Sequence, residues 1–240
     1  MNDVTSNKAC VLLSGGMDSV AALHWAVGRY SEVRAIGFDY GQPHRDAELA
    51  AAGKCARGLG VRCIILALAD AFTGVRLGLL GTVVDHDPTA IGGTNPAFLP
   101  GRNAVLLTLA AMHACAWWPV GNIALVMGAC AEDAAGFADC RPQFLTTLAS
   151  VIRRGHGRQV DIVAPWVGLS KGGILAALHE NAAAIADMQR SWSCYRGENT
   201  GPCGGCTACV VRAKAFAAAR LDDLSAYPVM TGGDPAREVG

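Results

Sequence analysis

The sequence lacks an excess of charge of either sign. Its 240 residues hold 20 Lys and Arg against 20 Asp and Glu, and only 17% of them are charged. Balanced charge without a polybasic run gives no electrostatic signal for binding nucleic acid or an anionic membrane surface. We therefore expect a small molecule or a protein as the partner.

Long hydrophobic runs are also missing, and we expect no leader peptide. The first residues carry no basic segment, and the apolar run at 9–13 is too short for the core of a secretion signal. The longest apolar stretch, 104–120, contains His113 and falls short of the roughly 20 apolar residues that cross a bilayer. We expect a cytoplasmic protein without a membrane segment, and a reducing compartment favours metal binding by clustered cysteines over disulfides.

Apolar residues make up 52% of the chain, which excludes disorder, and they fall into alternating patterns. Residues 69–100 show little periodicity and predict a long lid or binding loop. Alternating strands and helices predict a Rossmann-like α/β fold, with a parallel sheet and helices on both faces. Short apolar runs predict strands at 9–13, 33–38, 61–66, 123–127 and 160–164. Helical patterns follow at 19–27, 45–57, 102–117, 141–153 and 171–180, with a last helix after 209.

A glycine-rich turn, Ser14-Gly15-Gly16-Met17-Asp18-Ser19, joins the first strand to the first helix. Its glycines let the backbone approach a ligand, and the N–H groups at the helix start favour phosphate oxygens. Asp18 predicts a Mg²⁺ ion, because a carboxylate and a polyphosphate otherwise repel each other. The turn is neither a Walker A loop nor a dinucleotide fingerprint. It resembles the pyrophosphate loop of the N-type ATP pyrophosphatases, which split ATP between the α and β phosphates.

Four of the 10 cysteines are spaced as metal ligands. Their pattern, C-x8-C-G-G-C-x2-C, predicts a closed, structural Zn²⁺ site at Cys194, Cys203, Cys206 and Cys209. An iron–sulfur cluster and two disulfides are the alternatives, and a reducing compartment disfavours the disulfides. Cys140 lies beside Asp139 in an acidic loop expected at 128–141. We expect the other five to fill apolar space: Cys10, Cys55, Cys63, Cys115 and Cys130.

Several motifs extend the resemblance over nearly the whole chain. They are LLSGGMDS (12–19), FDYGQPH (38–44), LPGRN (99–103), GACAEDAAGFADCRPQF (128–144), LSKGGI (169–174) and SCY…PCGGCTACVVRAKAF (193–216). Together they resemble the 7-cyano-7-deazaguanine synthases of the queuosine and archaeosine pathways. The resemblance implies an adenine nucleotide alpha hydrolase-like fold. It also implies a pyrophosphate-loop ligase domain at 1–188 and a zinc-binding segment with a helix at 189–240.

The resemblance further implies an ATP-dependent carbon–nitrogen ligase. It would convert 7-carboxy-7-deazaguanine and ammonia to the nitrile through an adenylate and an amide. Mg²⁺ would accompany ATP, Zn²⁺ would be structural, and the enzyme would be a homodimer. ATP would contact Leu13, Ser14, Gly15, Gly16, Met17, Asp18, Ser19, Asp39 and Tyr40. Catalytic roles would fall to Asp18, Arg102, Asp133, Asp139, Arg141 and Lys171, with Arg141 pairing with the substrate carboxylate.

Departures from the family pattern lie in the substrate segments. Pro43 stands where a basic residue is usual, and Ala135-Gly136-Phe137-Ala138 replaces Ser-Gly-Tyr-Pro. These changes leave open a related ligase that stops at the amide or joins the acid to another amine or a protein. A tRNA-thiolating enzyme is a further alternative, which the zero net charge disfavours. A non-catalytic zinc module is the last one, and the intact SGGMDS disfavours it.

Overall fold

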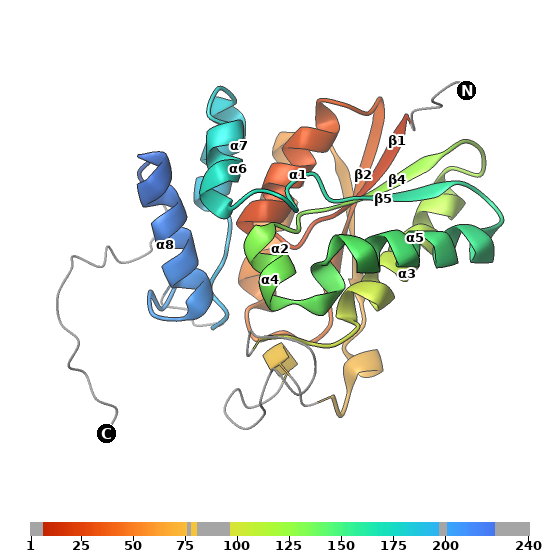
Figure 1. Cartoon of the computed structure of the whole chain (residues 1–240), viewed down its shortest axis with the longest axis horizontal. Helices are drawn as coiled ribbons and strands as arrows, with labels where there is room; N and C mark the ends of the chain where they lie inside the picture. The colour runs from red at the N-terminus through yellow and green to blue at the C-terminus, as the bar shows by residue number, and fades with distance from the viewer. Residues whose placement is uncertain (1–6, 76–77, 81–96, 197–200, 224–240) are drawn as a thin grey trace.

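Five short strands form the centre of the molecule: β1 (Lys8–Leu12), β2 (Glu32–Asp39), β3 (Arg62–Ala67), β4 (Ile123–Met127) and β5 (Val160–Val163). The computed structural model describes residues 7–75, 78–80, 97–196 and 201–223. The strands pair in parallel in the order β3-β2-β1-β4-β5 (Figure 1). β1 is central, so its residue Cys10 pairs with Arg34 of β2 on one side and Leu125 of β4 on the other.

Helices cover both faces of the sheet, as the alternating pattern predicts (Figure 1). They are α1 (Met17–Val27), α2 (Arg45–Gly58), α3 (Arg102–Trp117), α4 (Ala131–Gly136), α5 (Pro142–His156), α6 (Lys171–Ala177), α7 (Ala182–Arg190) and α8 (Thr207–Ala219). Side chains alternate along a strand. Val11 of β1 therefore packs in a core with Leu23 of α1 and Phe216 of α8, whereas Cys10 packs in a second core with Leu107 of α3. The Rossmann-like α/β fold is confirmed.

Two helices differ from the expected ones. The acidic loop expected at 128–141 contains α4, because Cys130 and Asp133 close a capping box at its start. The helix predicted over 171–180 ends at Ala177. A separate helix, α7, then begins after Asn181, whose side chain accepts a hydrogen bond at 3.0 Å from a backbone N–H of its first turn.

The loop expected at 69–100 contains two short 3-10 turns, Asp70–Phe72 and Gly78–Leu80. Its residues 76–77 and 81–96 lie outside the described part of the chain. No helix within the described ranges has the length and apolar character that crossing a bilayer requires. The division at 188 stays a prediction; across it, α8 packs against α6.

One buried guanidinium ties α8 to the end of α7. Arg212 is fully buried, and its Nε and Nη2 donate to the two carboxylate oxygens of Asp223 at 2.8 and 2.9 Å. Its terminal nitrogens also donate to the carbonyl oxygens of Met188 and Gln189 at 3.1 and 2.9 Å, and to Ser191 Oγ at 2.8 Å. Arg212 therefore fixes the segment that leads into the cysteines.

We expect Arg212→Ala to lower the free energy of unfolding by about 3 to 5 kcal/mol, because it leaves the partly buried Asp223 carboxylate and several carbonyl groups without their donor. Urea denaturation followed by circular dichroism measures this change. Lys214 lies on the same helix but is exposed. Lys214→Ala should therefore change the free energy by less than about 0.5 kcal/mol. Equal effects of the two substitutions would contradict the role assigned to Arg212.

Candidate active site

A cavity of about 270 Å³ opens at the carboxyl ends of β1, β2 and β4. The chain order reverses between β1 and β4, and ligands bind at such switch points in open α/β sheets. β1 leads into the loop at 14–19, β2 leads into Tyr40, and β4 leads into Gly128. The sheet therefore brings motifs that are far apart in the chain to one cavity wall.

The loop at 14–19 is held by its own hydroxyl groups. Ser14 Oγ donates to Ser19 Oγ at 3.1 Å. Ser19 Oγ in turn donates to the carbonyl oxygen of Gly16 at 2.9 Å and accepts from the N–H of Gly15 at 3.1 Å. α1 begins at Met17, earlier than the expected 19–27, so the helix start lies within the loop. The unpaired N–H groups of such a start attract phosphate oxygens.

Two glycines permit close approach of the elements around this loop. A Cβ atom at Gly15, where φ is +95°, would lie 2.0 Å from the carbonyl oxygen of Glu48. A Cβ atom at Gly128 would lie 2.5 Å from the backbone of Asp18. A side chain at either position would push α2 or the end of β4 away from the loop. The loop at 14–19, α2 and the end of β4 therefore pack as one unit.

Four polar side chains meet beside the loop: Asp18, Cys130, Asp133 and Lys171. Lys171 Nζ is in direct contact with Asp18 Oδ2, and it lies 3.4 Å from Cys130 Sγ and 3.9 Å from Asp133 Oδ1. Burial raises the pKa of Asp18 to about 6, although the Lys171 ammonium opposes this shift. Burial lowers the pKa of Lys171, but Asp18 and Asp133 raise it well above its usual value, so Lys171 is charged.

The same cluster could hold a divalent cation. One ligand atom from each of Asp18, Cys130 and Asp133 lies within 4.8 Å of the others. Asp18 Oδ1 is buried without a hydrogen-bond partner, so one carboxylate oxygen is available to a ligand. Carboxylate oxygens suit Mg²⁺, whereas a thiol does not. Cys130 is fully buried in the apolar core, as expected, but its Sγ also lies 3.2 Å from Asp133 Oδ2, so it belongs to this polar cluster as well.

Arg102 of α3 reaches the end of β2. Its Nη1 donates to the hydroxyl of Tyr40 at 3.1 Å, and its guanidinium carbon lies 5.6 Å from the centre of that ring. Arg102 Nε is buried without a hydrogen-bond partner, a cost that an anionic ligand would remove. Asp39 also ends β2, but its carboxylate pairs with Arg45 at 3.4 Å and does not line the cavity.

A second cluster of polar side chains in the cavity wall consists of Gln42, His44 and Glu48, from α2 and the loop before it. His44 Nδ1 lies 3.0 Å from the carbonyl oxygen of Tyr195, and His44 Nε2 lies 3.5 Å from Glu48 Oε2. Gln42 Nε2 donates to the same carboxylate oxygen at 3.4 Å. Burial raises the pKa of Glu48 to about 7 and lowers that of His44 to about 4. The FDYGQPH motif contains two of these residues, but no sequence pattern indicates their contact with Glu48 or Tyr195.

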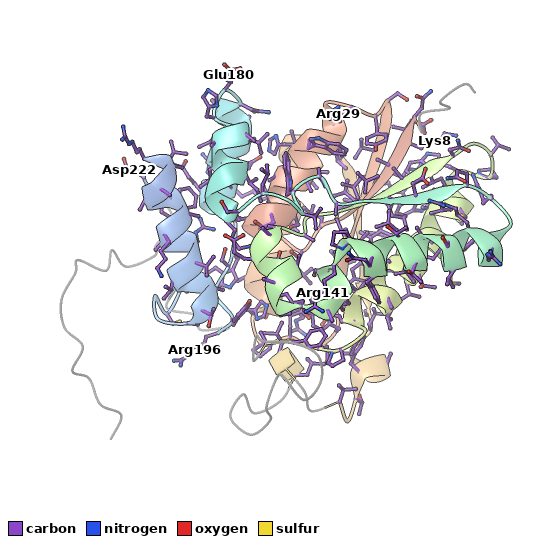
Figure 2. The ribbon with its side chains drawn as sticks, viewed as in Figure 1. Lys8, Arg29, Arg141, Glu180, Arg196 and Asp222 are labelled. Carbon is purple, nitrogen blue, oxygen red and sulfur yellow. The ribbon has the colours of Figure 1, made fainter. Side chains whose placement is uncertain are left out.

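Two residues expected in catalysis lie outside the cavity lining. Asp139 is buried, and its Oδ2 accepts from the N–H of Asn103 at 3.0 Å, which satisfies a donor in the first turn of α3. Arg141, next to the start of α5, donates from Nε to the carbonyl oxygen of Ala134 at 3.3 Å (Figure 2). The lining does include the other expected catalytic residues, Asp18, Arg102, Asp133 and Lys171. It also includes the expected ATP contacts Leu13, Ser14, Gly16, Met17, Ser19 and Tyr40.

Four thiols come together at the start of α8. The Sγ atoms of Cys194, Cys203, Cys206 and Cys209 lie within 4.8 Å of one another, with Cys206 and Cys203 at 3.4 and 3.9 Å from Cys209. All four are free thiols, so the disulfide alternative is wrong. Desolvation raises the pKa of Cys203, but the N–H groups of Cys206 and Gly205 lower it to about 7 overall. The cluster could therefore hold a metal ion.

The segments next to the cysteines form one wall of the cavity. The backbone N–H of Trp192 donates to the carbonyl oxygen of Gly15 at 3.0 Å, so this wall touches the loop at 14–19 directly. A metal ion at the cysteines would therefore hold the wall in place. The wall residues are Trp192, Ser193, Tyr195, Thr207, Ala208 and Val211.

The chain is similar to known proteins over nearly its whole length. Residues 8–220 match the model of the family described as "Queuosine biosynthesis protein QueC". The chain is 38% identical to a 7-cyano-7-deazaguanine synthase of Chromobacterium violaceum over 228 residues, which cover 93% of this chain and 94% of that protein. It is 39% identical to one of Laribacter hongkongensis over 217 residues, which cover 90% of this chain and 92% of that protein.

A solved structure also shares the fold. The crystal structure of a 4-thiouridine synthetase–RNA complex with bound ATP gives a TM-score of 0.50 at 14% sequence identity. The match covers 89% of this chain and 50% of that chain. At this identity the likeness concerns the fold alone.

Proposed function

The chain belongs to the QueC family, and on that premise we propose that it is a 7-cyano-7-deazaguanine synthase. The reaction joins 7-carboxy-7-deazaguanine and ammonia at the expense of ATP and ends at the nitrile. One observation carries the proposal: relatives of this name are 38% and 39% identical over at least 90% of the chain. The cavity supports it, because the glycine-rich loop, Arg102 and Lys171 share one lining.

The reaction has to turn an oxygen of the substrate into a leaving group twice, first on the acid and then on the amide. A carboxylate oxygen is a poor leaving group, so the acid is first joined to AMP, and ammonia then displaces AMP to give an amide. The amide oxygen is joined to a second AMP before the nitrile forms. One loop can serve both steps, because each is an attack on the α-phosphate of ATP. Catalysis then depends on positioning and on neutralised charge, without a protein nucleophile.

Charged residues of the cavity take the following roles in this proposal. Arg102 and Lys171 neutralise phosphate or carboxylate oxygens, and the partnerless Nε of Arg102 supports its role. Asp18 and Asp133 would hold Mg²⁺, which supplies further positive charge to the phosphates when bound. Asp139 acts indirectly, by holding the start of α3.

The metal at the four cysteines is Zn²⁺ in this proposal. Zn–S bonds of about 2.3 Å in a tetrahedron place two sulfur atoms about 3.8 Å apart. The separations of 3.4 and 3.9 Å from Cys209 are close to this value. Four thiolates leave no open coordination position, so the ion is structural. An iron–sulfur cluster is disfavoured, because sulfur atoms within 4.8 Å of one another suit a single ion.

A cytoplasmic homodimer completes the proposal. The residues Val105 and Met112 on α3 are 43% and 55% exposed, which offers apolar surface to a second subunit. Neither a membrane nor a nucleic acid is a partner in this proposal. A ligase that stops at the amide, or joins the acid to another amine or a protein, is not favoured by the named relatives.

The mass of the product tests the function. We expect purified protein supplied with 7-carboxy-7-deazaguanine, ATP, Mg²⁺ and ammonia to form the nitrile and to release two AMP for each nitrile. Omission of ATP should prevent any product, because neither oxygen can then leave. A wild-type reaction that stops at the mass of the amide would overturn the proposal in favour of the related ligase.

A further inference from the structure

Glu48 and His44 form a polar pair in the cavity wall that the roles above leave unused. Both line the cavity, and their side chains are only 14% and 3% exposed. Glu48 Oε2 and His44 Nε2 lie 3.5 Å apart. We propose that Glu48, positioned by His44, is the base that removes the last proton from nitrogen when the adenylated amide becomes the nitrile. This inference rests on the proposed function.

The surroundings of His44 fix which ring nitrogen carries the hydrogen. Nδ1 lies 3.0 Å from the carbonyl oxygen of Tyr195, and a carbonyl oxygen can only accept, so Nδ1 carries the hydrogen. Burial lowers the pKa of His44 to about 4, so the ring is neutral and Nε2 presents a lone pair. A lone pair opposite a carboxylate oxygen repels it unless a proton lies between them. His44 therefore stabilises a proton on Glu48 Oε2, which the protonated carboxyl group donates to His44 Nε2.

The other neighbours of Glu48 keep the pKa of its carboxyl group near neutral pH, so that it can both gain and lose a proton. Burial raises the pKa of Glu48 to about 7, while the Gln42 amide and the Arg102 guanidinium act to lower it. Two phenols, Tyr40 and Tyr195, also line this part of the cavity, and burial raises the pKa of each, that of Tyr195 to about 12. They therefore stay neutral. A carboxyl group that titrates near neutral pH is well suited to act as a general base there.

The backbone places Glu48 beside the expected site of adenylation. Its carbonyl oxygen occupies the space next to Gly15 that a Cβ atom would need. The backbone of Glu48 is therefore packed against the loop that would bind the phosphates of ATP. Opposite it, the Tyr195 carbonyl holds His44 from the cysteine segment. Glu48 thus enters the cavity between the loop and the wall.

The last step of the reaction is the one that most needs a base. After ammonia attacks the acyl adenylate, the nitrogen is positively charged and loses a proton readily to water. In the adenylated amide, the last N–H belongs to a neutral nitrogen and is only weakly acidic. As Glu48 takes this proton, the N–H electron pair becomes the third C–N bond. The C–O bond breaks, and its electron pair leaves with AMP, so the products are the nitrile, AMP and protonated Glu48.

Glu48→Gln separates the two half-reactions, because glutamine keeps the size of the side chain but cannot take up a proton. We expect this variant to accumulate the amide from acid, ammonia and ATP at about the wild-type rate. Conversion of supplied amide to nitrile should slow by about 10²- to 10⁴-fold. The wild-type rate of that conversion should rise with pH through about 7 as Glu48 loses its proton, and the variant should lack this rise.

His44→Ala should keep the rise but move it to lower pH. Without the imidazole, protonated Glu48 has no hydrogen-bond acceptor at Oε2, so the pKa of Glu48 falls.

Glu180→Gln is the matched control, because Glu180 lies on the exposed surface away from the cavity (Figure 2). It should form nitrile at the wild-type rate.

Wild-type protein that forms neither amide nor nitrile would contradict the proposed function itself. Wild-type nitrile together with equal slowing of both half-reactions in Glu48→Gln would contradict the inference alone, and would indicate that Glu48 binds the N–H edge of the deazaguanine. Unchanged nitrile formation by Glu48→Gln would also overturn it. Release of pyrophosphate from acid and ATP shows that the variant is folded.

Discussion

Asp18→Asn is expected to lower the rate of AMP formation by about 10³-fold or more. The carboxylate of Asp18 contacts the buried ammonium of Lys171 and keeps one oxygen without a partner for a cation. Asparagine keeps the shape but removes the charge that, in the proposed function, would order Lys171 and Mg²⁺ at the phosphates of ATP. Loss of one preorganised donor at a developing charge costs about 10²- to 10³-fold, and here two cations lose their anchor. Release of AMP from acid, ammonia and ATP over a range of Mg²⁺ concentrations measures the effect.

Asp46→Asn provides the comparison for that measurement. Asp46 lies on α2 with its side chain 89% exposed, so its variant should release AMP at the wild-type rate. Both proteins should melt cooperatively, which separates lost chemistry from lost structure. An Asp18→Asn variant with a near-wild-type rate and an unchanged Mg²⁺ requirement would rule out Asp18 as the cation ligand.

If the four cysteines bind the proposed Zn²⁺, Cys209→Ser is expected to purify without the ion and to melt at least about 10 °C below the wild type. The four thiols meet only in the folded chain, so the free energy of metal binding adds to the free energy of folding. For a chain of this size, each lost kcal/mol lowers the melting temperature by about 2 to 4 °C. The nitrile-forming activity should fall as well, because Trp192 and Tyr195 belong to the cavity wall next to the four cysteines.

Elemental analysis of the purified protein and a thermal melt test this expectation together. Cys115→Ser is a matched change, since Cys115 is a free, partly buried thiol of α3 outside the four-cysteine cluster. It should retain one equivalent of Zn²⁺. A full equivalent of Zn²⁺ in Cys209→Ser would show that the four cysteines are not its ligands.

The fold could be predicted because its signals are local. A buried parallel strand is a continuous apolar run, and the glycine-rich turn marks where β1 gives way to α1. α7 was missed although a signal exists: Asn181 precedes a run of alanines, and asparagine is a strong N-cap residue. α4 is harder to find, because its cap uses Cys130, a residue type seldom read as a helix start.

The cavity could be predicted only in part, because its contacts join distant segments. The motifs identify Asp18 and Lys171 separately, but only the fold shows that the two side chains meet. Glu48 lies outside the quoted motifs and becomes a candidate only through His44. Motif position alone also does not show where a side chain goes, so Arg141 was expected at the substrate carboxylate but donates to Ala134 instead.

The central place of β1 also sets the order in which the cavity can form. On one side β1 pairs with β2, which follows soon in the chain, but on the other side Lys8 pairs with Ile123 of β4. During synthesis, that second edge of β1 stays without its partner until β4 has left the ribosome. The wall residues, from Trp192 and Tyr195 to Val211, emerge later still. Parallel pairing over such separations is slow. The loop that would bind ATP is therefore made early in translation and becomes a complete site only near its end.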